Sequence, residues 1–194
     1  GAGVPWPTSA TVVTVATAMK GPDKSTDLLQ RALYKEFLLE PGLYLEAGLE
    51  DLPRRLAGHL QCGEQEAIPL LLASVNLEPL STEDLKFMFS IRDMSFSRTA
   101  AAVAMDLMAP AATYDRCIRI ALCYAVLGRH GHVFSALRAA AAKDDKFARH
   151  HHLYGLVLAL QGNAERANWE LGFALANEPF EECKARIRQV QGLV

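Results

Sequence analysis

The stretch ARHHHLYGLVLALQGNAERANWELGFALANEPFE, residues 148–181, decides the fold, because its small and apolar residues recur at the spacing of two helices joined by a turn. The preceding segment, YDRCIRIALCYAVLGRHGHVFSALRAAAAKDDKF, residues 114–147, has the same length and aligns with it without a gap. Gly162 in the turn of one segment matches Gly128 in the other. A repeat of this length is typical of stacked helix hairpins, which bury their apolar faces against one another.

Small residues stand where two antiparallel helices of such a hairpin must approach closely. Gly155 and the equivalent Ala121 leave room for the facing helix. Ala167 and Ala174 lie seven residues apart and therefore share one face of the second helix. The spacing thus predicts two successive helix hairpins.

The two segments resemble tetratricopeptide repeats (TPR), whose pattern is W-x2-L-G-x2-Y, a turn glycine, Ala-x3-Phe-x2-Ala and a closing proline. Gly155, Ala167, Ala174 and Pro179 match this pattern to the letter. The resemblance implies an all-α, right-handed superhelix of antiparallel helix hairpins. It also implies a concave groove, lined by the first helix of each repeat, that receives a peptide or a helix of a partner protein.

We predict one TPR-like helical domain over residues 10–194. Its parts are degenerate repeats at 10–113, clear repeats at 114–181 and a capping helix at 180–194 that closes the exposed end of the solenoid. Residues 1–9 are expected to be a flexible N-terminal segment or an expression remnant. Because the chain begins without Met, it can also be a fragment of a larger protein.

The repeat pattern is weaker upstream. Ser25 to Leu39 is expected to form an amphipathic helix that closes with Leu-Glu-Pro. Its first partner helix would be Ala10 to Met19, although the β-branched run at 11–15 equally suits an extended segment. Ala67 to Pro79 resembles the second helix of another repeat, and Pro69 requires that this helix start late or bend.

Residues 82–113 are expected to form a shortened repeat, with an N-terminal cap at Ser81 and an Ala-rich helix from Thr99 to Met108. The final helix, from Phe180 to Val194, has one apolar and one solvated face. Its apolar residues are Cys183, Ile187, Val190 and Val194, and its solvated ones are Glu181, Glu182, Lys184, Arg186 and Arg188.

Composition narrows the class of protein. The chain has 194 residues, of which 51% are hydrophobic and only 8% aromatic, which favours packed helices rich in Ala and Leu. A net charge of −2 argues against a nucleic-acid binder, and the longest apolar runs are too short to span a membrane. The cysteines form no C-x-x-C pair, so we expect them to be reduced, which favours a location in the cytoplasm over one in the periplasm. They are Cys62, Cys117, Cys123 and Cys183.

No catalytic or cofactor-binding motif occurs in the sequence, so we expect a protein that is not an enzyme and holds no cofactor. Three adjacent histidines, His150 to His152, are the one notable cluster. His130 and His132 belong to the opposite end of a hairpin, about 20 Å away, and neighbouring histidines on a helix diverge by about 100°. We therefore expect solvated polar helix ends and no metal site.

The charges are segregated along the chain. Residues 40–85 carry nine acidic and two basic side chains, whereas residues 114–152 carry seven basic and three acidic ones. Two interpretations remain open. The charges solvate helix faces, or they steer a charged partner or a second copy of the chain.

The resemblance places the groove on the first helices of the two clear repeats. Most of these positions are apolar, and the Lys and Asn clamp of chaperone-binding members is absent. An apolar groove fringed by basic side chains suits an amphipathic helix or an apolar peptide with acidic flanks. The predicted groove residues are Ile118, Arg119, Leu122, Val126, Arg149, His152, Leu156 and Leu160.

Three interpretations of this surface follow. An adaptor or chaperone-like protein would bury a partner's segment in the groove. A structural scaffold would use its surfaces to form a homo-oligomer. Alternatively, the groove leucines pack against the N-terminal segment of the same chain.

Overall fold

The computed structural model describes residues 24–74, 80–89 and 113–194, and these form ten helices with no strand among them. The all-α class is therefore confirmed for this part of the chain. The predicted helices at 10–19 and 99–108 lie outside the described residues. The helices are α2 (Lys24–Leu39), α3 (Leu43–Glu46), α4 (Leu52–Leu60), α5 (Glu64–Ala73), α6 (Thr82–Met88), α8 (Tyr114–Val126), α9 (His130–Lys143), α10 (Ala148–Leu160), α11 (Ala164–Asn177) and α12 (Glu181–Gln191).

Helices α8 to α11 form two hairpins that repeat at the predicted period. Both ends of α10 fall at the positions that align with the ends of α8, and both ends of α11 align in the same way with those of α9. The turns contain Gly128 at φ 74° and Gly162 at φ 80°, a left-handed conformation that favours glycine. Within each hairpin the two helices pack extensively against each other.

Gly155 lets α10 and α11 approach closely, as predicted from its position. A Cβ atom at this residue would lie 2.6 Å from Cγ of Leu171 and 3.2 Å from the carbonyl oxygen of Ala167. Ala167 and Leu171 are themselves fully buried. The contact between the two helices therefore depends on the missing side chain.

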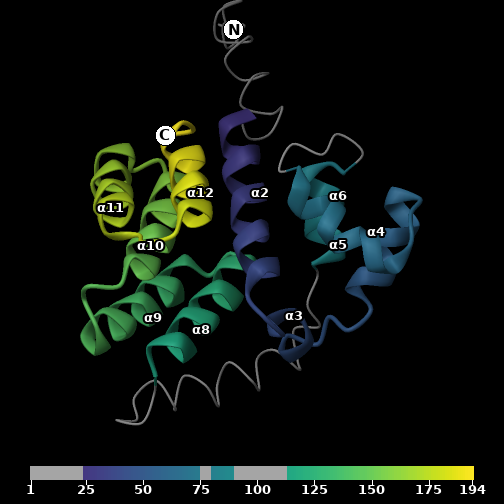
Figure 1. Cartoon of the computed structure of the whole chain (residues 1–194), viewed down its shortest axis with the longest axis horizontal. Coiled ribbons are helices and arrows are strands. Elements are labelled where there is room, and N and C mark those ends of the chain that lie inside the picture. Colours follow the sequence, from purple (N-terminus) through teal and green to yellow (C-terminus); the bar gives the residue numbers. More distant parts are fainter. Residues whose placement is uncertain (1–23, 75–79, 90–112) are drawn as a thin grey trace, which may run out of the picture.

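Helix α2 runs through the middle of the molecule, with α4, α5 and α6 on one side and α8 to α12 on the other (Figure 1). On one side it packs against α3, α5 and α6, where Tyr34 stacks on Phe89 at 4.6 Å between ring centroids. On the other side it packs against α8 and α10. Both layers thus share α2 as a common core element.

Two upstream predictions are refined by the structure. Helix α5 begins at Glu64 and contains Pro69, so the late start is wrong. Pro69 is the sixth of the ten residues of α5, so its ring nitrogen cannot donate the hydrogen bond that the carbonyl oxygen of Gln65 would otherwise accept. Ser81 caps α6 as predicted: its hydroxyl accepts a hydrogen bond from the Asp84 amide, and the Asp84 carboxylate accepts one from the Ser81 amide.

Helix α12 packs against α11, and Ile187 and Val190 on its inner face are buried. Val194 lies beyond the end of the helix and is 37% exposed, so its predicted place on the apolar face is wrong. The four cysteines are unpaired thiols. None of the helices in the described ranges is long and apolar enough to cross a membrane.

Candidate functional site: the face of helices α8 and α10

Helices α8 and α10 carry all eight residues predicted to line the groove. Ile118, Leu122, His152 and Leu156 are buried, with at most 2% of their surface exposed. The side chains of the two arginines are 18% exposed at Arg119 and 23% at Arg149. The other two residues, Val126 and Leu160, are half-buried. We call this surface the α8–α10 face.

Helix α2 of the same chain covers the α8–α10 face. It contacts both helices, and Glu36 on α2 reaches side chains of α10. Leu29 and Leu33 precede Glu36 by seven and three residues, so the three share one side of α2. The third interpretation of the groove leucines, packing against the chain's own N-terminal segment, agrees with this arrangement.

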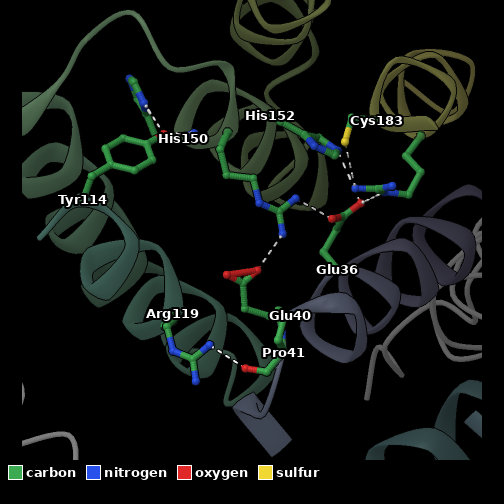
Figure 2. A network of polar contacts seen from close by, with 10 residues as sticks. Glu36, Glu40, Pro41, Tyr114, Arg119, His150, His152 and Cys183 are labelled. Carbon is green, nitrogen blue, oxygen red and sulfur yellow. Dashed lines mark hydrogen bonds and ion pairs between the residues drawn. The ribbon is translucent and has the colours of Figure 1, made fainter. Parts of the chain in front are cut away.

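A buried carboxylate lies at the centre of the contact between α2 and α10 (Figure 2). Glu36 is 2% exposed. Its Oε2 accepts a hydrogen bond from Nη1 of Arg149 at 2.5 Å, and its Oε1 accepts one from Nε of Arg186 on α12 at 2.8 Å. Nε2 of His152 lies 3.8 Å from the same Oε1 and has no hydrogen-bond partner. We call Arg149, His152 and Arg186 the carboxylate cradle.

The cradle keeps Glu36 ionised. Burial alone would raise the pKa of this carboxyl, but the nearby Arg149, His152 and Arg186 lower it to about 2. Burial also lowers the pKa of His152 to about 4, against the opposing effect of Glu36. His152 is therefore neutral near pH 7, and the two guanidinium groups supply the compensating charge.

Further ion pairs extend from the cradle along the rim of the α8–α10 face. Arg149 also lies 3.5 Å from the Glu40 carboxylate. Arg119 on α8 donates to the carbonyl oxygen of Pro41 at 2.8 Å and pairs with Glu46 on α3 at 2.7 Å. Part of the charge segregation seen in the sequence is thus neutralised inside the chain, because Glu40 and Glu46 of the acidic stretch pair with arginines of the basic one.

The expectation that His150 to His152 are solvated is wrong for two of them, because His150 and His152 are both at most 3% exposed. The backbone amide of His150 donates to the Tyr114 hydroxyl, which lies 2.9 Å from the ring Nδ1 (Figure 2). His151 Nδ1 lies 2.6 Å from Glu170 on α11. The polar contacts of His150, His151 and His152 thus reach α8, α11 and α2, although the rings of His150 and His151 lie only 4.1 Å apart between centroids. The described residues contain no cluster of three or more potential metal ligands.

Two functional candidates escaped sequence reasoning. The sequence pattern gives Glu36 no role, although a carboxylate on the apolar side of an amphipathic helix is a detectable signal. The pattern of α12 predicts a solvated Arg186, whereas its side chain is 19% exposed and binds Glu36. Only the tertiary packing of α12 beside α2 and α10 creates that contact.

A second surface carries exposed aromatic rings. Trp169 on α11 is 63% exposed and stacks on Phe173 with 5.9 Å between ring centroids. Phe180, just before α12, is 68% exposed. A shallow hollow beside Trp169 is lined by Asn163, Glu165, Arg166 and Trp169.

No protein-family model, curated protein or solved structure matches this chain. The candidate functions therefore rest on the geometry of the α8–α10 face and of the exposed aromatic surface.

Proposed function

We propose that this protein is a non-catalytic, TPR-like protein-binding module whose α8–α10 face holds a helix or peptide of a partner, as an adaptor or chaperone does. One observation carries the proposal. The face already accommodates an amphipathic helix, α2, with buried apolar residues on both sides of the contact and matched charges at its centre. A surface shaped for one helix is suited to helix-in-groove recognition.

The repeat geometry supports the TPR-like superhelix as part of this proposal. Two hairpins with matching helix lengths follow each other at a period of about 34 residues, which is the length of a TPR unit. The first helix of each hairpin contacts α2. This orientation agrees with the family pattern, in which first helices line the groove.

Photo-crosslinking tests the proposal directly. A photoreactive amino acid replaces Val126 or Leu160, which are half-buried at the face, or Arg138 on the exposed surface of α9 as a control. After incubation with extract of the native source, we expect a partner to be crosslinked from positions 126 and 160 and not from 138. Crosslinks from 138 alone, or from none of the three, contradict the proposal.

Substitution of the buried leucines would not test partner binding. Leu122 and Leu156 are both fully buried. A glutamate at either position would place an unpaired charge in the core and unfold the domain. Loss of capture by such a variant would report on stability.

Self-assembly into a scaffold is the second candidate, and the exposed Trp169 and Phe180 favour it. If these rings mediate association, sedimentation velocity of the wild type shows concentration-dependent oligomers and the Trp169→Ser variant does not. A monomer at every concentration, at low and high salt, counts against the scaffold.

A further inference from the structure

We infer that the partner recognised by the α8–α10 face is an amphipathic helix that carries a carboxylate on its apolar side and places it in the cradle of Arg149, His152 and Arg186, and that α2 is an internal occupant which this helix displaces. The inference rests on the proposed function and specifies the chemistry of its partner. It commits to a helix of another protein as the occupant.

Charge complementarity across the covered face is the first argument. The α2–α3 side contributes the carboxylates of Glu36, Glu40 and Glu46. The opposite side contributes guanidinium groups from α8, α10 and α12, at Arg116, Arg119, Arg149 and Arg186. With α2 absent the face would present these guanidinium groups beside its apolar side chains, which matches a helix that carries carboxylates among its apolar residues.

The cradle has one donor more than Glu36 uses, and this is the second, independent argument. Arg149 and Arg186 each bond one carboxylate oxygen, whereas Nε2 of His152 is buried, 3.8 Å away and without a partner. A buried polar atom without a partner costs free energy. Nε2 of His152 therefore remains available to a carboxylate that lies closer to it than that of Glu36 does.

The packing of α2 provides a route for the exchange. Its opposite side packs against α5 and α6, and Tyr34 stacks on Phe89, which directly follows α6. The α2 helix can therefore leave the α8–α10 face together with these helices, without exposing its aromatic side. Because α2 competes for the face, the apparent affinity for a partner equals the intrinsic affinity multiplied by the fraction of chains whose face is open.

A peptide competition experiment tests the inference with the full chain. The probe is a fluorescein-labelled, end-capped peptide of residues 24–41, in its native form and with Glu36→Gln. The protein is the wild type, the Glu36→Gln variant, or Glu83→Gln as a control that alters an exposed carboxylate paired with Lys86.

We expect the Glu36→Gln protein to bind the native peptide at least about tenfold more tightly than the wild type or Glu83→Gln does, because its own α2 no longer fills the cradle. The same protein should bind the Gln peptide at least about tenfold more weakly than the native one, because the cradle then lacks its carboxylate. Equal binding of both peptides, or no gain over the wild type, overturns the inference. A Glu36→Gln protein that dimerises in sedimentation also overturns it, since a second copy is then the occupant.

If circular dichroism shows that the Glu36→Gln protein does not fold, hydrogen exchange measured on the wild type tests the inference instead. A saturating amount of native peptide should raise the exchange rate of α2 amides while α8 and α10 stay protected. Unchanged exchange of α2 overturns the inference. The proposed function is judged separately: crosslinking of a partner at Val126 or Leu160 upholds it even if the peptides show no preference for the carboxylate.

Discussion

At the scale of single residues, Gly155 sets the distance between α10 and α11. Alanine has the higher helix propensity by about 1 kcal/mol. At this position, however, its Cβ would lie 2.6 Å from Cγ of Leu171, and overpacking of this kind typically costs about 1–3 kcal/mol. We expect Gly155→Ala to lower the free energy of unfolding by about 1 kcal/mol, measured by urea titration with circular dichroism.

Gly172 provides the matched control, because it lies inside α11 and a Cβ there would meet no atom within 4 Å. Gly172→Ala should raise the free energy of unfolding by about 0.5–1 kcal/mol. If both variants gain stability, the close approach at Gly155 does not constrain the hairpin.

The contacts of a single residue could be predicted where its neighbours lie in the same repeat. Gly155 and its contacts Ala167 and Leu171 all belong to the single repeat at 148–181, so a repeat pattern carries the information. Glu36 and Arg186 are 150 residues apart, and no local pattern links them. For the same reason the burial of His152 escaped sequence reasoning, because α2 is what covers it.

At the scale of elements, the capping box of α6 holds the start of a seven-residue helix. Ser81→Ala removes the hydroxyl that accepts a hydrogen bond from the Asp84 amide at 3.0 Å. We expect a loss of about 0.5–2 kcal/mol in the free energy of unfolding. Relative to the wild type, hydrogen exchange should become faster in α6 and change less in α10.

Ser135→Ala is the control for this cap. Ser135 lies inside α9, where its hydroxyl donates to the carbonyl oxygen of Gly131, a bond that does not cap the helix. Its replacement should leave the stability unchanged or slightly higher. Equal losses from both substitutions would show that the hydroxyl at Ser81 has no special role as a cap.

Helix boundaries were predictable where the sequence contains turn glycines or a capping residue. The glycine turns and the repeat period located α8 to α11, and Ser81 located the start of α6. Pro69 was harder to interpret, because a proline inside a helix usually breaks it, and yet α5 continues on both sides of this residue. The packing of α2 against both layers is a tertiary property that periodicity does not encode.

At the scale of the whole molecule, buried ionisable groups make the fold sensitive to acid. Burial lowers the pKa of His150 and of His152 to about 4. The ordinary pKa of histidine in an unfolded chain is about 6.5. As the pH falls from about 6.5 to 4, these histidines therefore bind protons in the unfolded chain but not in the folded protein, and the free energy of unfolding decreases.

Glu36 adds a second phase at lower pH. Its pKa is about 2 in the folded protein, against a value near 4.3 for an unperturbed glutamate. The stability that it contributes is complete above about pH 4.3 and is lost as the pH falls toward 2. Urea midpoints measured between pH 7 and 3 should decline in both ranges, and His152→Gln should reduce the slope between pH 6.5 and 4. A midpoint that stays constant from pH 7 to 4 contradicts the assignment of neutral, buried histidines.

The carboxylate cradle also imposes an order on synthesis. Glu36 precedes Arg149 by 113 residues and Arg186 by 150. At roughly 5–20 residues per second, a ribosome needs roughly 8–30 s to span the interval between Glu36 and Arg186. During this interval Glu36 of the newly made α2 stays in water, and its charge helps to hold the apolar side of the helix in solution until its two arginines emerge.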